Sequence, residues 1–265
     1  MTPPNPLATL LDWYVAMGAD EAIGLEPHDC TAAVSSEPRT VGIVAPSPRP
    51  TALPVSIPLV PPAAAVASAR ELAEGAQTLA ALEATVRSFE GCLLKRTATN
   101  TVFADGNPAA AVMIVGEAPG ADEDRIGRPF VGRAGQLLDL MLAAIGLDRT
   151  SAYITNVLFW RPPGNRKPTP DEIAACVPFL WRHIALARPK VVVMAGGTSA
   201  STLLGRSEGI MRLRGRWFDL PVPGLAAPVP ALATFHPSFL LRTPARKGDA
   251  WADLLSLQAR LKTIG

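Results

Sequence analysis

Residues 111–120, Ala-Val-Met-Ile-Val-Gly-Glu-Ala-Pro-Gly, join a short apolar run to a turn rich in glycine and proline. A short apolar run that ends at such a turn is typical of a buried strand in a parallel sheet. Residues 152–155, 190–194 and 230–234 have the same form. We therefore expect a central, mostly parallel, four-stranded sheet.

Segments with a helical pattern lie between and after these strands, at residues 133–145, 170–187, 198–204 and 250–261. Strands that are apolar on both faces and alternate with helices need helices on both sides of the sheet. This pattern predicts the α/β class and a three-layer α/β/α sandwich.

The N-terminal part has a different composition. Residues 7–24 place Leu10, Leu11, Tyr14 and Met17 at helical spacing and predict an amphipathic helix. Residues 26–64 are rich in proline, serine, alanine and valine, which predicts an extended or disordered linker.

A second helix is expected at about residues 66–89 and leads into the sheet. We therefore divide the chain into an N-terminal helix with its linker, residues 1–65, and a larger domain, residues 66–265. We expect the N-terminal helix to pack on the domain, and a protein partner for it is the alternative.

The composition excludes several classes of protein. No apolar run approaches the roughly 18 residues of a membrane span, and no signal peptide is recognisable, so we expect a soluble, cytoplasmic protein with no membrane contact. The three cysteines, Cys30, Cys92 and Cys176, are too few and too far apart for a disulfide framework. A net charge of +2 does not by itself indicate nucleic-acid binding. We expect a monomer.

Polar residues follow each of the four expected strands. Glu117 lies in the turn after the first strand and Asn156 follows the second. Residues 196–199, Gly-Gly-Thr-Ser, follow the third, and His236 follows the fourth. Because ligands bind beyond the carboxyl ends of parallel strands, we expect these four turns to line one cleft.

Two side chains near this cleft suit a planar base. Phe130 lies in a constrained loop just before a helix, where its ring could stack on a base or belong to the core. The Asn156 amide can donate and accept at once, which matches the edge of a pyrimidine, although it could equally bond to neighbouring backbone. The glycine-rich turn 116–120 is also compatible with a plain strand exit.

Two segments suit a nucleic-acid backbone. Residues 161–168 form a proline-stiffened basic loop, which fits phosphate contact or is simply solvated. Residues 236–242 join an apolar run to Arg242, as in a wedge that unstacks a duplex, or in a helix that packs on the core.

In this order, these segments resemble family 4 uracil-DNA glycosylases, over about residues 88–259. The strongest stretches are residues 116–120, 127–138, 161–170, 213–217 and 236–241. The resemblance implies the same fold and an enzyme that flips uracil out of single- or double-stranded DNA and hydrolyses its N-glycosidic bond. A DNA-binding protein of this fold without catalysis, and a nucleotide-binding enzyme, are the alternatives. The sequence lacks the phosphate-cradling motif that a nucleotide-binding enzyme needs.

The resemblance also implies the catalytic roles. Glu117 would place and polarise the attacking water, Asn156 would pair with N3 and O4 of uracil, and His236 would hydrogen-bond O2 as negative charge develops there.

The resemblance places the remaining site residues around the base and the DNA strand. The residues implied to contact the base, besides Asn156, are Gly116, Ala118, Gly120 and Phe130. The residues implied to contact DNA are Arg161, Asn165, Arg166, Lys167, Ser238, Phe239, Leu240, Leu241 and Arg242, the last five in a loop that inserts into DNA.

Most members of the resembled family bind a 4Fe-4S cluster through four cysteines. Here Phe89 and Trp160 stand at two of these positions, and only Cys92 and Cys176 match. Two thiolates do not satisfy such a site. We expect no cluster and no metal, with Phe89 and Trp160 filling the volume.

Two further positions differ from the best-known uracil glycosylases. Ala118 stands where they carry an activating aspartate, and Gly120 where a tyrosine blocks the methyl group of thymine. The second difference predicts a roomier pocket and activity on other deaminated or modified bases. No histidine lies between Trp160 and Cys176, so we expect ordinary product release without a covalent link.

Overall fold

The computed structural model describes residues 62–264, so the expected helix at residues 7–24 and nearly all of the linker lie outside the described residues. Helix α2 begins at Pro62, ahead of the expected start at residue 66. None of the helices between residues 62 and 264 is long and apolar enough to cross a membrane.

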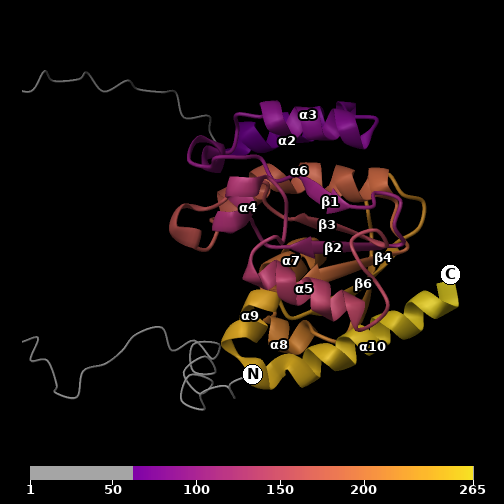
Figure 1. Ribbon diagram of the computed structural model, residues 1–265. Helices are drawn as coiled ribbons and strands as arrows, with labels where there is room; N and C mark the ends of the chain where they lie inside the picture. The colour runs from indigo at the N-terminus through magenta and orange to yellow at the C-terminus, as the bar shows by residue number, and fades with distance from the viewer. Residues whose placement is uncertain (1–61, 265) are drawn as a thin grey trace, which may run out of the picture. The chain divides into compact units, whose positions relative to one another are not determined.

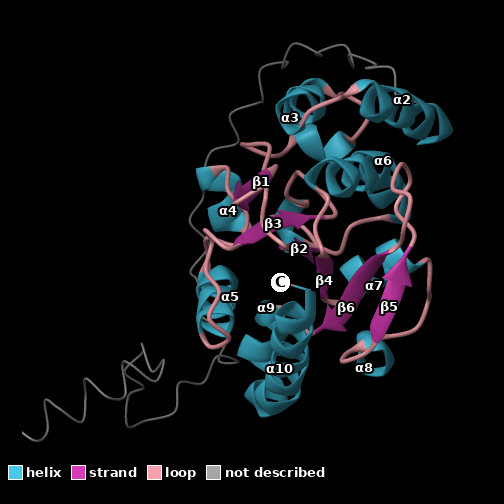
Figure 2. Ribbon diagram, turned by 90° about the vertical axis from the view of Figure 1, so that its right-hand side faces the viewer, coloured by secondary structure: helices cyan, strands magenta, loops and turns pink. Residues whose placement is uncertain are grey.

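A six-stranded sheet with the order β1-β3-β2-β4-β6-β5 forms the centre of the fold (Figure 2). Its strands are β1 (Ala104–Gly106), β2 (Val112–Gly116), β3 (Ala152–Asn156), β4 (Val191–Ala195), β5 (Trp217–Leu220) and β6 (Val229–Thr234). Strands β2, β3, β4 and β6 pair in parallel, as expected from the four apolar runs.

The expected count of four strands was too low because β1 and β5 add antiparallel edges to β3 and β6. Strand β1 has only three residues, none of them buried, and β5 buries only Leu220. Such short edge strands lack the continuous apolar run by which buried strands are recognised.

Helices cover both faces of the sheet (Figure 1). Their bounds are α2 (Pro62–Gly75), α3 (Leu79–Ser88), α4 (Ala121–Ile126), α5 (Arg133–Ala143), α6 (Pro170–Ala187), α7 (Gly197–Leu204), α8 (Ile210–Leu213), α9 (Pro237–Arg242) and α10 (Lys247–Ile264), with short 3₁₀ turns at Leu93–Arg96, Pro163–Asn165 and Pro244–Arg246.

The two faces of each central strand serve different cores. In β2, Met113 and Val115 join the core beneath α6 and α7, whereas Val112 and Ile114 join the core beneath α5 and α10. Side chains alternate across a strand, so burial on both faces produces the continuous apolar run seen in the sequence.

The single helix expected at residues 66–89 is instead two helices, which is a correction to the sequence interpretation. Helix α2 ends at Gly75, and Thr78 caps α3 by accepting a hydrogen bond from the Ala81 amide at 3.1 Å. Both helices pack on α6 and form an additional layer outside it (Figure 1). A local cap therefore overrides the continuous helical pattern.

His183 of α6 is a core residue. Its imidazole lies 2.9 Å from the Tyr153 hydroxyl and stacks on Phe103 at 4.3 Å between ring centroids. Burial lowers the pKa of His183 to about 3.

Stability should therefore fall on acidification. Below pH about 6.5 the unfolded chain protonates this imidazole and the folded chain does not until pH about 3. This single group should remove up to about 1.4 kcal/mol of unfolding free energy per pH unit in that window. Urea unfolding of wild type and His183→Gln between pH 7 and 4.5 measures the difference in slope. Equal slopes would contradict the assignment.

Candidate active site

The turns that follow the four parallel strands line one cleft, as the sequence predicted. The cleft has a volume of about 560 Å³ and lies at the carboxyl ends of β2, β3, β4 and β6. Its lining includes Glu117, Ala118, Gly120, Phe130, Asn156, Asn165, Arg166, Lys167, Gly196, Phe235, His236, Ser238, Phe239 and Arg242.

Asn156 presents an unsatisfied amide at this cleft. The residue ends β3, is 1% exposed, and its Oδ1 has no hydrogen-bond partner among the described residues. A methyl group at Gly116 would lie 2.3 Å from that oxygen, so the missing side chain of Gly116 leaves room beside it. A buried acceptor without a partner costs about 1–3 kcal/mol, and a ligand N–H would remove this cost.

Phe130 forms an aromatic wall next to this amide. Its ring approaches to within 2.6 Å of where a Gly116 methyl group would stand, and its centroid lies 5.4 Å from the His236 ring. A larger residue at position 116 would therefore displace both the ring and the amide. The ring, the amide and the imidazole border the same space.

His236 is held as a neutral hydrogen-bond donor. Its Nδ1 caps α9 by accepting from the Ser238 amide at 3.1 Å, and it also lies 2.8 Å from the Ser238 hydroxyl. Since Nδ1 is an acceptor, the neutral ring carries its proton on Nε2. Burial, together with the nearby positive charge of Arg242, lowers the pKa of His236 to about 4. The ring is therefore uncharged at neutral pH.

Glu117 is held from a neighbouring turn. The Thr198 hydroxyl, at the start of α7, donates to Oε2 of Glu117 at 2.5 Å. Thr198 belongs to the turn 196–199 identified in the sequence, and its partner Glu117 lies 81 positions away, in the turn after β2. The hydroxyl restricts the carboxylate and leaves Oε1 for another donor.

The sequence interpretation missed the buried carboxylate of Glu123, on α4. Glu123 accepts from the amides of Gly120, Val131 and Gly132 at 3.0, 2.9 and 2.8 Å. Its only sequence signal is an acidic residue in the first turn of a helix, which occurs in many proteins.

The basic loop lies at the rim of the cleft. Asn165, Arg166 and Lys167 line it, whereas Arg161 does not and instead donates to Oδ1 of Asn165 at 2.7 Å. The Arg166 guanidinium donates two hydrogen bonds to the Glu172 carboxylate, at 2.6 and 2.9 Å. Hydrogen bonding from Arg166 lowers the pKa of Glu172, so this pair is charged at neutral pH. The loop is therefore tied to α6.

The segment expected to form an inserting loop is helix α9, which is a third correction. Leu240 is 1% exposed and packs with Phe235 and Ala250, so it belongs to the core, contrary to its expected role in DNA contact. Its neighbour Leu241 is 37% exposed, and Phe239 and Arg242 line the cleft. The helical period, with its cap at His236, separates the buried leucine from the exposed one.

The residues at the four expected cluster positions do not fit a 4Fe-4S cluster. Phe89 and Trp160 are buried, with the Phe89 ring 5.0 Å from Phe179 and the Trp160 indole donating to Thr101 at 3.0 Å. Cys92 and Cys176 are buried free thiols. The neighbouring Cys92 thiol, together with burial, holds the pKa of Cys176 well above its ordinary value.

Within residues 62–264, no group of three or more histidine, cysteine, aspartate or glutamate side chains is arranged so that it could hold a metal ion. Two thiols, one of them kept protonated, together with two aromatic rings make a packed apolar core and no four-thiolate site.

Known proteins resemble this chain in sequence. A family model described as the uracil DNA glycosylase superfamily matches residues 103–255. The type-4 uracil-DNA glycosylase of Pyrobaculum aerophilum is 39% identical over 173 residues, 64% of this chain and 87% of the relative. That of Thermotoga maritima is 43% identical over 158 residues, 59% of this chain and 80% of the relative. The chain therefore belongs to the uracil-DNA glycosylase superfamily.

Proposed function

We propose that this protein is a uracil-DNA glycosylase that flips uracil out of DNA and hydrolyses its N-glycosidic bond, leaving an abasic site. One observation carries the proposal: the buried Asn156 amide, the Phe130 ring and the His236 imidazole line a single cleft at the strand ends. Together they provide a pairing edge, a stacking surface and a donor for an anion.

Asn156 would select the base. Uracil offers an N3–H donor to the unpartnered Oδ1 and an O4 acceptor to the amide nitrogen. Cytosine has an acceptor at N3 and an amino donor at position 4. Its N3 would face the Oδ1 acceptor and its amino group would face the amide nitrogen, so both hydrogen bonds would be lost. The Phe130 ring would stack on the flipped base and hold its edge against Asn156.

His236 would stabilise the leaving group. When the C1′–N1 bond breaks, the bonding electrons remain on uracil, and part of the charge collects on O2. A preoriented Nε2–H donor in a cleft shielded from water stabilises this charge, and such a donor contributes about 2.7–4 kcal/mol. Glu117, restrained by Thr198, would orient the water that adds to C1′.

The DNA strand would lie along the rim. The polar residues at this rim that suit phosphate contacts are Asn165, Arg166 and Lys167 of the basic loop and Arg242 of α9. Arg161 does not line the cleft, and we propose that it contacts the strand from beside Asn165. The exposed Leu241, with Ser238 and Phe239 beside it on α9, suits the space that the flipped base leaves in the stack.

The function is tested with oligonucleotides that contain one uracil, single-stranded or paired with guanine or adenine. Incubation followed by alkali should cut the strand at uracil, because alkali cleaves abasic sites. The same oligonucleotides with thymine or cytosine at that position are the controls. A protein that binds these strands without making them alkali-sensitive would instead be a DNA-binding protein without catalysis.

We propose that no iron–sulfur cluster is needed for folding or activity, because the buried rings of Phe89 and Trp160 stand at two of the four expected ligand positions. Protein purified without oxygen should contain no stoichiometric iron or acid-labile sulfide, and a strong iron chelator should leave its melting temperature and excision rate unchanged. Stoichiometric iron with visible charge-transfer absorbance would contradict this proposal.

We propose that the site also accepts other deaminated or modified bases. Gly120 lines the cleft without a side chain, so no side chain at this position blocks a substituent on the base. Single-turnover rates on 5-substituted uracils, hypoxanthine and xanthine should be measurable beside that on uracil. Turnover of uracil alone would contradict a broad specificity.

Further proposals concern the cellular setting. We propose that the protein acts as a cytoplasmic monomer with DNA as its substrate, and that it releases its product without a covalent link. For the helix expected at residues 7–24, which lies outside the described residues, a protein partner is a further proposal. Size-exclusion chromatography with light scattering tests the oligomeric state.

A further inference from the structure

Phe130 has an unusual backbone. Its φ is +55°, in the left-handed region that residues other than glycine rarely adopt, and the residue is only 5% exposed. A residue in such a conformation persists only where its surroundings fix it, and such residues gather at functional sites. The groups that hold this backbone are therefore of interest.

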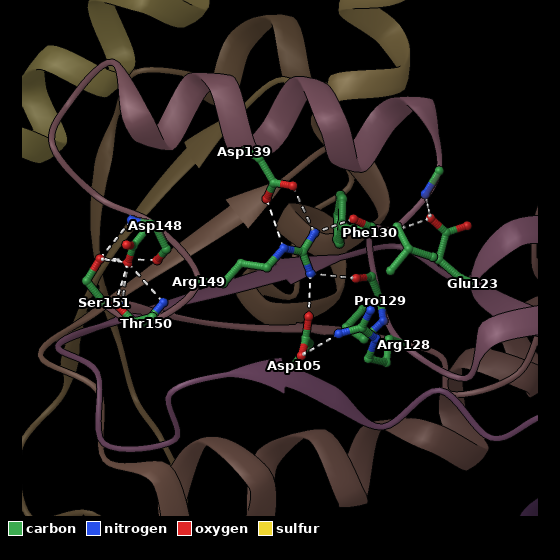
Figure 3. A network of polar contacts seen from close by, with 12 residues as sticks. Asp105, Glu123, Arg128, Pro129, Phe130, Asp139, Asp148, Arg149, Thr150 and Ser151 are labelled. Atoms are coloured by element: carbon green, nitrogen blue, oxygen red, sulfur yellow. Dashed lines mark hydrogen bonds and ion pairs between the residues drawn. The ribbon is translucent and has the colours of Figure 1, made fainter.

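Arg149, in the turn before β3, holds the carbonyl side of Phe130. Its guanidinium donates to the carbonyls of Phe130 and, at 3.2 Å, Pro129. Figure 3 shows the same guanidinium between Asp139 of α5 and Asp105 of β1, with contacts of 2.9 and 2.5 Å. The two carboxylates orient the guanidinium, so it presents its donors to the two carbonyls in one geometry.

Glu123 holds the amide side of the same loop. One carboxylate oxygen accepts from the amides of Val131 and Gly132, the two residues that follow Phe130. The other oxygen accepts from Gly120, in the turn that borders the cleft. Glu123 thus connects the loop that carries the ring with the turn that carries Glu117.

Helix α5 closes the remaining side. A methyl group at Gly135 would lie 1.7 Å from the carbonyl oxygen of Phe130, so the helix packs directly against this peptide. The peptide is therefore enclosed by a cation, an anion and a helix backbone. Neither the cation nor the anion lies among the residues to which the sequence resemblance gives a role.

We infer that Arg149 and Glu123 are positioning residues that hold Phe130 in its left-handed conformation and so fix its ring as the stacking surface for the flipped base. The inference rests on the proposed function for the stacking role. It implies that the surface is preorganised in the free enzyme, because both clamps consist of protein groups alone.

Arg149 also links β1, α5 and the turn before β3, so its loss will lower stability whatever its effect on the ring. A matched control is Arg182→Met. Arg182 donates to the Ala76 carbonyl at 2.7 Å, is likewise half-buried, and lies on α6 outside the cleft lining. Comparison of the two variants separates a general loss of stability from a loss of positioning.

The test is a double-mutant cycle on single-turnover uracil excision. Arg149→Met and Phe130→Ala should each slow excision by roughly 10- to 100-fold. The double variant should be no slower than Phe130→Ala, because Arg149 acts through that ring. Arg149→Lys should recover part of the rate, Glu123→Gln should show the same lack of additivity, and Arg182→Met should leave the rate unchanged.

Additive losses in the double variant, or an unchanged rate in Arg149→Met, would overturn the inference. An unchanged rate in Phe130→Ala would also overturn it, together with the stacking role, while excision itself would stand. Crystal structures give a readout that does not need activity: φ of Phe130 should be positive in the wild type and should leave the left-handed region in Arg149→Met. If the wild type does not excise uracil but φ of Phe130 still leaves the left-handed region in Arg149→Met, the proposed function is refuted. The positioning of Phe130 by Arg149 then stands.

Discussion

Replacing Asn156 with aspartate should lower the rate of uracil excision by about 10⁴-fold, the discrimination expected when a buried pairing group no longer matches its partner. The substitution keeps the size of the side chain but replaces the amide donor with an oxygen. That oxygen would face O4 of uracil, and two buried acceptors would be left against each other. Single-turnover rates on uracil-containing single strands measure the loss without the cost of opening a duplex.

Asn107→Asp is the matched control for this substitution. Asn107 is a half-buried amide that donates to the Thr150 carbonyl at 2.9 Å, and it does not line the cleft. The control should retain the wild-type rate. A rate for Asn156→Asp within about tenfold of the wild type would show that this amide does not pair with the base, since one lost hydrogen bond exceeds that factor.

Replacing His236 with alanine should slow excision by about 10²- to 10³-fold, the effect of removing one preoriented donor to a developing anion. The substitution also removes the cap of α9, which should cost about 1 kcal/mol of unfolding free energy. His236→Asn separates the two effects, because asparagine is a good cap but its shorter amide does not reproduce the imidazole donor. Recovery of the rate in His236→Asn would assign this histidine to the cap alone.

The pH dependence provides a second check on His236. Because burial lowers its pKa to about 4, the imidazole stays neutral from pH 8 down to about 5. The excision rate should therefore show no step near the ordinary histidine value of about 6.5. A fall in the rate with an apparent pKa near 6.5, absent in His236→Ala, would show that the ring is exposed and titrates normally.

The predicted effects at Asn156 and His236 depend on the same structural feature. The protein orients both groups: Oδ1 of Asn156 has no partner within the described residues, and Nδ1 of His236 accepts from the Ser238 amide, which places the ring proton on Nε2. Groups arranged in advance need no rearrangement during the reaction, which is the main source of electrostatic catalysis. Removing either one should therefore affect the chemical step more than the stability of the fold.

The sequence by itself determined the four parallel strands and the place of the cleft. Both depend on local patterns: short runs apolar on both faces, each followed by a turn with a polar residue. The carboxyl ends of parallel strands meet at one edge by geometry, so Glu117, Asn156 and His236 could be brought together without coordinates. The resemblance to a family supplied the roles, which the patterns alone left open.

Only the tertiary structure decided which side chains act on others from a distance. The edge strands, the contact of Thr198 with Glu117, and the clamp of Arg149 on Phe130 all join segments far apart in the chain. Leu240 and Leu241 look alike in sequence, and only the orientation of α9 buries one and exposes the other. The physical reason is that hydrogen bonds and burial depend on distance in space, whereas a sequence pattern reports only neighbours along the chain.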